Sequence, residues 1–480
     1  MKSSEGINWD DVEVLIVGSG TMGASLTQTY AQSGFNVGVL DISEEILERA
    51  KDAIGRELDT ARKFGIFSET QVAETKGRIL TSTSYEEACQ GKNLKLVIET
   101  ATENIEIKKK IFMQLDDLCL PHVVLATNSS SLDTNILAAC TKRPDKVVWM
   151  HYFYLPHKNR AGEYAGSDSA SPDSLEVAAR YMKLAGKVAT PILSSRKGGA
   201  ADVIFVSLLT EAARMVEEGF DIPSIEEAGK KAFDMPLGFL ELMDVTGIPI
   251  GIYTMYSFSD SSNPDDPLYQ VYGNYFSPPE SYVSLLNKYQ QAEDKSAVRW
   301  LSEDASKGTA PDSEVVEQLM NRLWAAGFMA AVETVGAGVI ELDEVERLCQ
   351  NAFLWSPFSM MNRIGMNKVW NIINQRKEEL EKQGIQFPVP QLYATQAEKG
   401  EPWPLVLSPV ASRQEQNGTV ARVSISNPKT ANALDSRVFE DLREAFRKAN
   451  QQEEAQVIIF DSAPIKTFIA GANVPDFIAN

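Results

Sequence analysis

The first 194 residues alternate short apolar runs with longer helical patterns. The predicted strands lie at residues 12–17, 37–40, near Ile79, 95–98, 123–126, 147–150 and 187–193. Helical patterns at 24–33, 44–64 and 105–118 lie between them. Strands that alternate with helices usually pair in parallel, so we expect an α/β domain, a Rossmann-type doubly wound parallel sheet, over residues 1–194.

Apolar positions beyond residue 194 recur at helical spacing. The predicted helices lie at 202–218, 224–233, 236–244, 315–335, 342–353 and 355–361. The second three follow the order of the first three, which indicates an internal duplication of an all-helical unit. We therefore expect a first helical domain at 195–300 and a second helical repeat at 301–385.

The last hundred residues change character twice. Residues 386–418 are rich in Pro, Gln and Gly, which is typical of a linker. Residues 419–480 then predict a partial α/β segment with strands at 420–426 and 457–460, a helix at 435–449 and a small-residue turn at 468–473.

The first strand ends in a glycine turn. Gly18, Gly20 and Gly23 form G-x-G-x-x-G between a strand and a helix, and Asp41 closes the next strand. This order suits a dinucleotide: the first glycine allows the tight turn, the second admits the pyrophosphate, and the third lets the helix pack closely. Thr21 and Met22, between the second and third glycines, belong to the same predicted cofactor site. An acid at Asp41 favours NAD over NADP, because it would accept bonds from the ribose hydroxyls and repel a 2′-phosphate.

Composition and charge limit the kinds of partner that the protein can bind and the cellular compartment in which we expect it. The chain has 480 residues, 44% of them hydrophobic and 23% charged, and a net charge of −20, which argues against nucleic-acid binding. Four scattered cysteines form no C-x-x-C pair, so we expect reduced thiols and no metal site. No apolar run approaches the roughly 20 residues that span a bilayer. We expect a soluble, cytoplasmic protein without a membrane partner.

Only three histidines could supply an imidazole base near neutral pH. His151 ends the apolar run 147–150, and strand ends are where α/β sheets bind their ligands. His122 opens a strand and His157 lies in a polar loop. His151 is therefore the candidate base.

Residues 14–247 resemble L-3-hydroxyacyl-CoA dehydrogenases. The glycine turn, Glu99 with Glu103 and Lys108, the run Asn128-Ser129-Ser130-Ser131-Leu132, His151, and 236–244 carry the resemblance. Residues 419–473 resemble the start of an enoyl-CoA hydratase (crotonase), through Asn427-Pro428, Asn432-Ala433-Leu434 and Ala470-Gly471-Ala472. A dehydrogenase joined to a hydratase is similar to the fused β-oxidation proteins, in which the helical unit is also duplicated.

The resemblance implies a site and a reaction. His151 would be the catalytic base, Glu163 its orienting partner, and Ser130 a donor to the substrate oxygen. Glu103 and Lys108 would contact the NAD cofactor. Chemistry agrees with these roles, because oxidation of a secondary alcohol needs a base with a pKa near 6.5 for the hydroxyl proton, and a carboxylate fixes the tautomer of that base.

Two positions depart from the family pattern within the predicted substrate site. Tyr154 replaces an asparagine after the aromatic pair that follows the histidine, and Asp202 replaces a neutral amide. A second carboxylate near His151 would favour imidazolium and make the base less available at neutral pH.

The hydratase-like segment is short for a working crotonase. It could place one oxyanion-hole N–H, at Ala472, but the second donor and the acid/base glutamates of that family belong to later parts of its fold. Either the chain is a piece of a longer fusion, or a remnant serves as a structural appendage. We assign it no hydratase activity.

The expected activity is therefore NAD-dependent oxidation of a 3-hydroxyacyl-CoA to the 3-ketoacyl-CoA, in fatty-acid or other acyl-CoA degradation. Two alternatives remain: a dehydrogenase of a free hydroxy acid, and an inactive NAD-binding scaffold for the hydratase-like part. The apolar faces of the helical units could pair as a homodimer.

Overall fold

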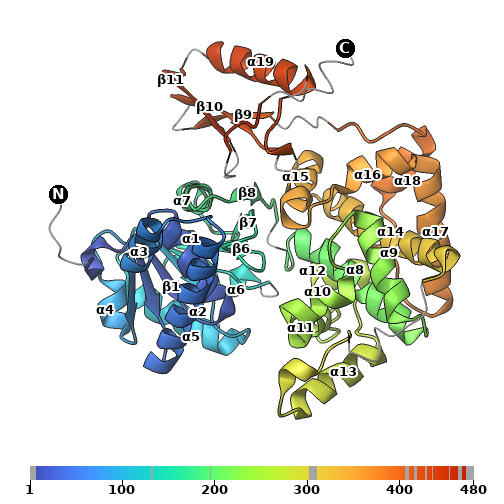
Figure 1. Cartoon of the computed structure of the whole chain (residues 1–480), viewed down its shortest axis with the longest axis horizontal. Helices are drawn as coiled ribbons and strands as arrows, with labels where there is room; N and C mark the ends of the chain where they lie inside the picture. Colours follow the sequence, from blue (N-terminus) through green and yellow to red (C-terminus); the bar gives the residue numbers. More distant parts are fainter. Residues whose placement is uncertain are drawn as a thin grey trace. The chain divides into compact units, whose positions relative to one another are not determined.

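The computed structural model describes residues 7–130, 133–194, 196–301, 311–405, 410–415, 419–427, 430–434, 436–452, 454–462 and 467–471. The chain forms two compact units (Figure 1). The first contains Met1–Ala185 and Ala189–Trp403, and the second contains Gly186–Val188 and Pro404–Asn480.

An eight-stranded sheet forms the N-terminal part of the first unit. Its strands are β1 (Val14–Val17), β2 (Val37–Leu40), β3 (Ile79–Ser82), β4 (Leu96–Glu99), β5 (Val124–Thr127), β6 (Val147–Tyr152), β7 (Ala161–Gly166) and β8 (Val188–Pro191). They lie in the order β3-β2-β1-β4-β5-β6-β7-β8. Strands β1 to β6 pair in parallel, whereas β7 runs antiparallel to β6. The doubly wound parallel sheet is confirmed; the sequence pattern did not predict β7.

Helices cover both faces of this sheet. They are α1 (Thr21–Gln32), α2 (Glu44–Lys63), α3 (Glu69–Gly77), α4 (Tyr85–Cys89), α5 (Ile105–Leu118), α6 (Thr134–Ala138) and α7 (Pro172–Leu184). Side chains alternate along β1, so Val14 and Ile16 pack with α1 and α7, while Leu15 and Val17 pack with α5 on the other face. The alternation of side chains along these strands therefore produces two hydrophobic cores, one on each face of the sheet.

The rest of the first unit is helical and repeats. Its helices are α8 (Ala201–Glu217), α9 (Ile222–Phe233), α10 (Phe239–Thr246), α11 (Ile248–Phe258), α12 (Pro267–Tyr272), α13 (Glu280–Gln291), α14 (Ser313–Gly336), α15 (Leu342–Ala352), α16 (Pro357–Ile364), α17 (Met366–Lys382) and α18 (Gln391–Lys399). The Glu226 carboxylate of α9 accepts the N–H of Leu240 in α10, and the Glu346 carboxylate of α15 accepts the N–H of Phe358 in α16. The same type of hydrogen bond, from the start of one helix to a glutamate of the helix before it, thus occurs in both halves, and this supports the duplication of the helical unit.

A buried charge cluster joins the two helical repeats. Glu211 of α8 is fully buried, and its Oε1 lies 2.7 Å from Nε of Arg322 in α14 and 2.8 Å from a guanidinium nitrogen of Arg376 in α17. Burial alone would raise the pKa of Glu211, but the charges of Arg322, Arg376 and Arg214 hold the pKa at about 2. The carboxylate therefore stays ionised between the repeats.

The second unit is a small α/β fold. It contains β9 (Val410–Glu415), β10 (Val420–Ile425), α19 (Ser436–Asn450) and β11 (Val457–Ser462), with β10 parallel to β11 and antiparallel to β9. The range 386–418, predicted as a linker, contains α18 and β9. The N–H of Leu434 donates to the carbonyl of Gly471 at 2.8 Å, which joins the second and third motifs of the hydratase resemblance. Pro428, Ala472 and Asn473 lie outside the described residues.

Among the described residues, no helix is long and apolar enough to cross a membrane, and no group of His, Cys, Asp or Glu side chains is placed to hold a metal ion.

The charge cluster generates a stability prediction. We expect Glu211→Gln to lower the apparent free energy of unfolding by about 3–5 kcal/mol at pH 7, because it leaves buried guanidinium groups without their anion. Since folding depresses the Glu211 pKa, this contribution is present above its ordinary value of 4.5 and is lost as pH falls toward 2. Denaturant unfolding of both proteins from pH 7 to pH 3 measures the difference.

Glu227→Gln is the matched control. Glu227 pairs with Lys231 on the surface of α9, so its loss should cost less than about 1 kcal/mol. Equal stability of the Glu211 variant and the wild type at pH 7 would contradict the assigned role of the cluster.

Candidate functional site

The turn between β1 and α1 contains two glycines that the fold itself requires. Gly18 has a φ of +92°, and a Cβ on Gly23 would lie 1.9 Å from the carbonyl oxygen of Gly18. A Cβ on Gly20, by contrast, would meet no atom within 4 Å. Gly20 precedes Thr21 and Met22 as the N-cap of α1 and makes no side-chain cap bond. The open space at Gly20, next to unbonded helix N–H groups, fits a dinucleotide phosphate.

Asp41 closes this turn from the end of β2. Its Oδ2 accepts the N–H of Ser19 at 2.6 Å and the Ser19 hydroxyl at 2.8 Å, and its Oδ1 accepts the N–H of Ile42. Asp41 therefore has a structural role in holding the turn. Its contact with a ribose stays a prediction.

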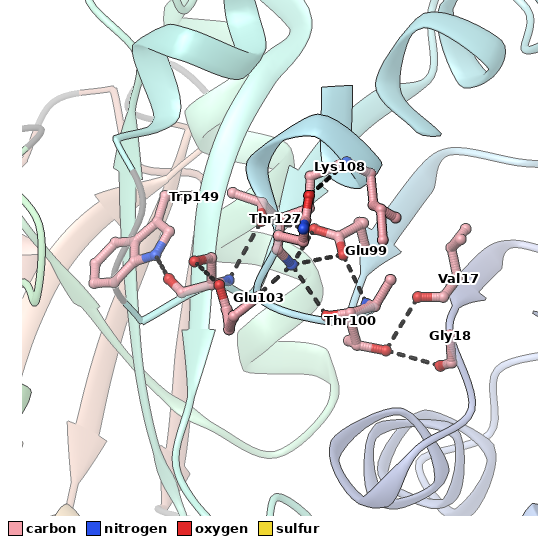
Figure 2. A network of polar contacts seen from close by, with 12 residues as sticks. Val17, Gly18, Glu99, Thr100, Glu103, Lys108, Thr127 and Trp149 are labelled. Carbon is pink, nitrogen blue, oxygen red and sulfur yellow. Dashed lines mark hydrogen bonds and ion pairs between the residues drawn. The ribbon is translucent and has the colours of Figure 1, made fainter. Parts of the chain in front are cut away.

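A buried ion pair lies beside the turn at the end of β4. Lys108 Nζ donates to both carboxylate oxygens of Glu99, at 2.7 and 2.9 Å, and Thr127 donates to the same carboxylate (Figure 2). Burial raises the pKa of the Glu99 carboxyl even though Lys108 and Thr127 bond to it. Because Lys108 is fully buried in this pair, its position is explained without a cofactor, and its predicted cofactor contact remains untested.

Polar contacts continue from the glycine turn toward β6. The Thr100 hydroxyl donates to the carbonyl of Gly18 at 2.8 Å. Ser129 donates its hydroxyl to Glu103 at 2.7 Å, and its carbonyl accepts the indole N–H of Trp149 at 2.7 Å. Figure 2 shows these contacts from Gly18 to Trp149 along the carboxyl ends of the strands. The half-exposed Glu103 thus lies between the turn and β6.

His151 lies near the end of β6 with both ring nitrogens engaged. Its Nε2 lies 2.9 Å from the Ser130 hydroxyl and its Nδ1 lies 3.1 Å from Oε2 of Glu163. Glu163 lies directly opposite His151 in the β6–β7 pairing, which explains how it reaches the ring. Trp149 stacks on the imidazole at 5.2 Å. The structure therefore brings together the three residues that sequence reasoning placed in the catalytic site.

The other oxygen of Glu163 holds the start of α8. Its Oε1 accepts the N–H groups of Ala200 and Ala201 at 2.9 and 3.0 Å. A Cβ on Gly199 would lie 2.6 Å from the Trp149 ring and 3.0 Å from this oxygen, so only glycine fits there without a shift. Sequence reasoning missed these backbone donors. The glycine pair at 198–199 before a helix was the available signal.

Asp202, in the first turn of α8, adds a second acid at the imidazole. Its carboxylate lies 3.5 Å from Nε2 of His151, on the nitrogen that also faces Ser130. Burial raises the pKa of Asp202 to about 6. Burial alone would lower the pKa of His151, but the charges of Asp202 and Glu163 outweigh it, so the pKa of His151 is raised.

Tyr154 lies in the loop between β6 and β7 and is 37% exposed. His157, for which the sequence suggested no role, anchors this loop: its Nδ1 lies 2.7 Å from the Ser25 hydroxyl on α1 and its Nε2 lies 3.3 Å from Glu57 on α2.

In the predicted motif at 128–132, the side chain of Asn128 accepts the backbone N–H of Tyr152 at 3.0 Å. Ser131 and Leu132 lie outside the described residues.

The geometry suits transfer of one proton from a hydroxyl group. A substrate oxygen that meets Ser130 and Nε2 of His151 could pass its proton to the ring, while Glu163 holds the proton on Nδ1 and stabilises the resulting imidazolium. A general base beside a dinucleotide turn would need such an arrangement.

Comparisons with known families match almost the whole chain. Residues 13–195 match the NAD-binding domain of 3-hydroxyacyl-CoA dehydrogenases, and residues 200–297 and 319–402 match the C-terminal domain of the same enzymes. Residues 415–480 match the enoyl-CoA hydratase/isomerase family.

Individual relatives agree with these matches. The chain is 29% identical over 245 residues to 3-hydroxybutyryl-CoA dehydrogenase of Clostridioides difficile, covering 51% of this chain and 86% of the relative. It is 32% identical over 238 residues to a probable 3-hydroxybutyryl-CoA dehydrogenase of Bacillus subtilis, covering 49% and 81%. The crystal structure of 3-hydroxybutyryl-CoA dehydrogenase from Escherichia coli superposes with a TM-score of 0.68 at 19% identity, covering 81% of this chain and 98% of that one, which shows a shared fold.

Proposed function

This chain belongs to the 3-hydroxyacyl-CoA dehydrogenase family, an NAD-dependent class of oxidoreductases, and we propose that its substrate is the L-3-hydroxyacyl-CoA itself. It oxidises the hydroxyl at C3 to the ketone, reversibly, in the degradation of fatty acids or other acyl-CoA esters. The observation that carries this proposal is the relay Ser130–His151–Glu163, with 2.9 and 3.1 Å between its members.

Three residues have separate roles in the proposed reaction. Ser130 orients the substrate oxygen by hydrogen bonding. His151 Nε2 accepts the hydroxyl proton, and Glu163 keeps Nδ1 protonated and the ring aimed at the substrate. The stacked indole of Trp149 excludes water from one face of the ring. Asp202 borders the substrate side of the same ring, 3.5 Å from Nε2.

The residues around Gly20 fit NAD. The open turn and the start of α1 would hold the pyrophosphate, with Thr21, Met22 and Asp41 beside it. NAD, when bound, accepts the hydride that leaves C3.

The activity can be tested by following NADH absorbance with a panel of L-3-hydroxyacyl-CoA esters and the corresponding free hydroxy acids. We expect turnover of the esters, a loss of about 10²–10⁴-fold in kcat for His151→Gln, and a loss of about 10–100-fold for Ser130→Ala, which removes one hydrogen bond to the substrate.

The same panel separates the alternatives. Turnover of the free acids alone would identify a hydroxy-acid dehydrogenase. Binding of NAD by calorimetry without turnover of any substrate would identify a scaffold and contradict the proposed activity.

Asp202 gives a pH prediction. Its carboxylate raises the pKa of His151, so the unprotonated base disappears as pH falls through that raised value. We expect Asp202→Asn to move the acidic limb of the kcat/KM profile for alcohol oxidation to lower pH. Asp202→Glu keeps the charge and is the control. A profile of Asp202→Asn that overlays the wild type would exclude Asp202 from the electrostatics of the site.

Gly20 gives a prediction for the cofactor. Ala at this position meets no protein atom, so we expect Gly20→Ala to leave the apparent Tm within about 2 °C and to weaken NAD affinity by about tenfold or more, through a clash with the phosphates. Gly77→Ala is the matched control, because Gly77 is equally open and lies at the end of α3. Unaltered NAD affinity in Gly20→Ala, measured by calorimetry, would remove the pyrophosphate from this turn.

A further inference from the structure

Three phenylalanine rings continue from the imidazole of His151 in direct contact. Phe153 meets His151 edge-on, with ring centroids 4.9 Å apart. Phe353 meets Phe153 at 6.0 Å, and Phe205 stacks on Phe353 at 5.1 Å with an interplanar angle of 11°. Phe153 directly follows β6, Phe205 lies in α8, and Phe353 directly follows α15. Phe353 therefore brings the second helical repeat into contact with the end of β6.

The outer rings remain partly open to solvent. Phe153 is buried, whereas Phe205 and Phe353 are only half-buried and the next residue, Leu354, is 50% exposed. Asp202 and Phe205 are three residues apart in α8 and therefore share one helix face. Because Asp202 faces Nε2 of His151, this face continues from the reacting nitrogen to the aromatic rings.

The backbone on both sides of Phe353 is constrained in this position. The side chain of Asn159, in the loop before β7, donates to the carbonyl of Ala352 at 3.1 Å. Leu354 has a φ of +68°, a left-handed conformation that costs a branched residue energy. The backbone on either side of Phe353 is thus constrained, which favours a fixed binding surface over a chance contact.

We propose that Phe205 and Phe353 bind the acyl tail of the substrate beyond C3, and that the second helical repeat thereby selects apolar tails long enough to reach Phe353. This inference rests on the proposed function. Apolar carbon groups gain most from contact with aromatic rings. A tail that ends in a carboxylate is disfavoured, because Asp202, Glu163 and Glu103 already place negative charge around the imidazole.

The test compares kcat/KM for four L-3-hydroxyacyl-CoA esters: butyryl, octanoyl, 3-phenylpropionyl and adipyl. We expect the octanoyl and phenyl esters to exceed the butyryl ester by about tenfold or more, and the adipyl ester to rank lowest. In Phe353→Ala the preference over butyryl should fall to about twofold, through a higher KM for the octanoyl and phenyl esters. Phe353→Leu, which keeps apolar volume, should retain part of the preference.

Phe67→Ala is the matched control. Phe67 is half-buried like Phe353, but it packs on α2 and α3, so its loss should leave the tail preference intact. An equal rate for butyryl and octanoyl esters in the wild type, or an unchanged preference in Phe353→Ala, would overturn the inference while leaving the proposed function in place.

A total lack of turnover would instead contradict the proposed function. The inference is then decided by calorimetric binding of the same four esters: loss of the tail preference in Phe353→Ala supports it, and an unchanged preference refutes it.

Discussion

The carboxylate of Glu163 is the interaction on which the site depends. It is fully buried and bonds His151 through one oxygen and the first two N–H groups of α8 through the other. An ionised carboxylate in such a place is stable only when its bonds are satisfied, and here a helix N-terminus and an imidazole satisfy them. The same bonds join β6, β7 and α8. The same carboxylate therefore orients the imidazole of the proposed site and joins the sheet to the helical region.

Asp202 changes the chemistry that this junction supports. A neutral side chain at its position would leave the imidazole with a single acidic partner, whereas the carboxylate adds charge 3.5 Å from the reacting nitrogen. The buried acid and the base then compete for the same proton, with the pKa of Asp202 at about 6 and the pKa of His151 raised. The protonation of the imidazole near neutral pH therefore depends on Asp202 as well as on Glu163.

The second helical repeat stabilises α8 and thereby the residues of α8 that lie beside His151. The ion cluster around Glu211 fastens α8 to α14 and α17, and Arg196 forms a two-bonded pair with Glu333 of α14 just before the turn that carries Ala200. The position of α8, and with it the bonds to Glu163 and the place of Asp202, is thus supported by the second repeat. Phe353 extends that support to the surface beside His151.

The sequence alone determined the doubly wound sheet and the glycine turn, because local periodicity and residue spacing record strands, helices and tight turns directly; the role of His151 as the base stays a prediction. It did not reveal β7, whose small residues carry no strand pattern, nor the backbone donors at Ala200 and Ala201, nor the anchoring of the loop by His157 through Ser25 and Glu57. Tertiary structure also decided that Lys108 is buried against Glu99 and that Phe353 contacts Phe153 at the end of β6. Most of these contacts join residues far apart in the chain, and pairings between distant segments leave no periodic trace in a single sequence, since only packing of the folded chain brings the partners together.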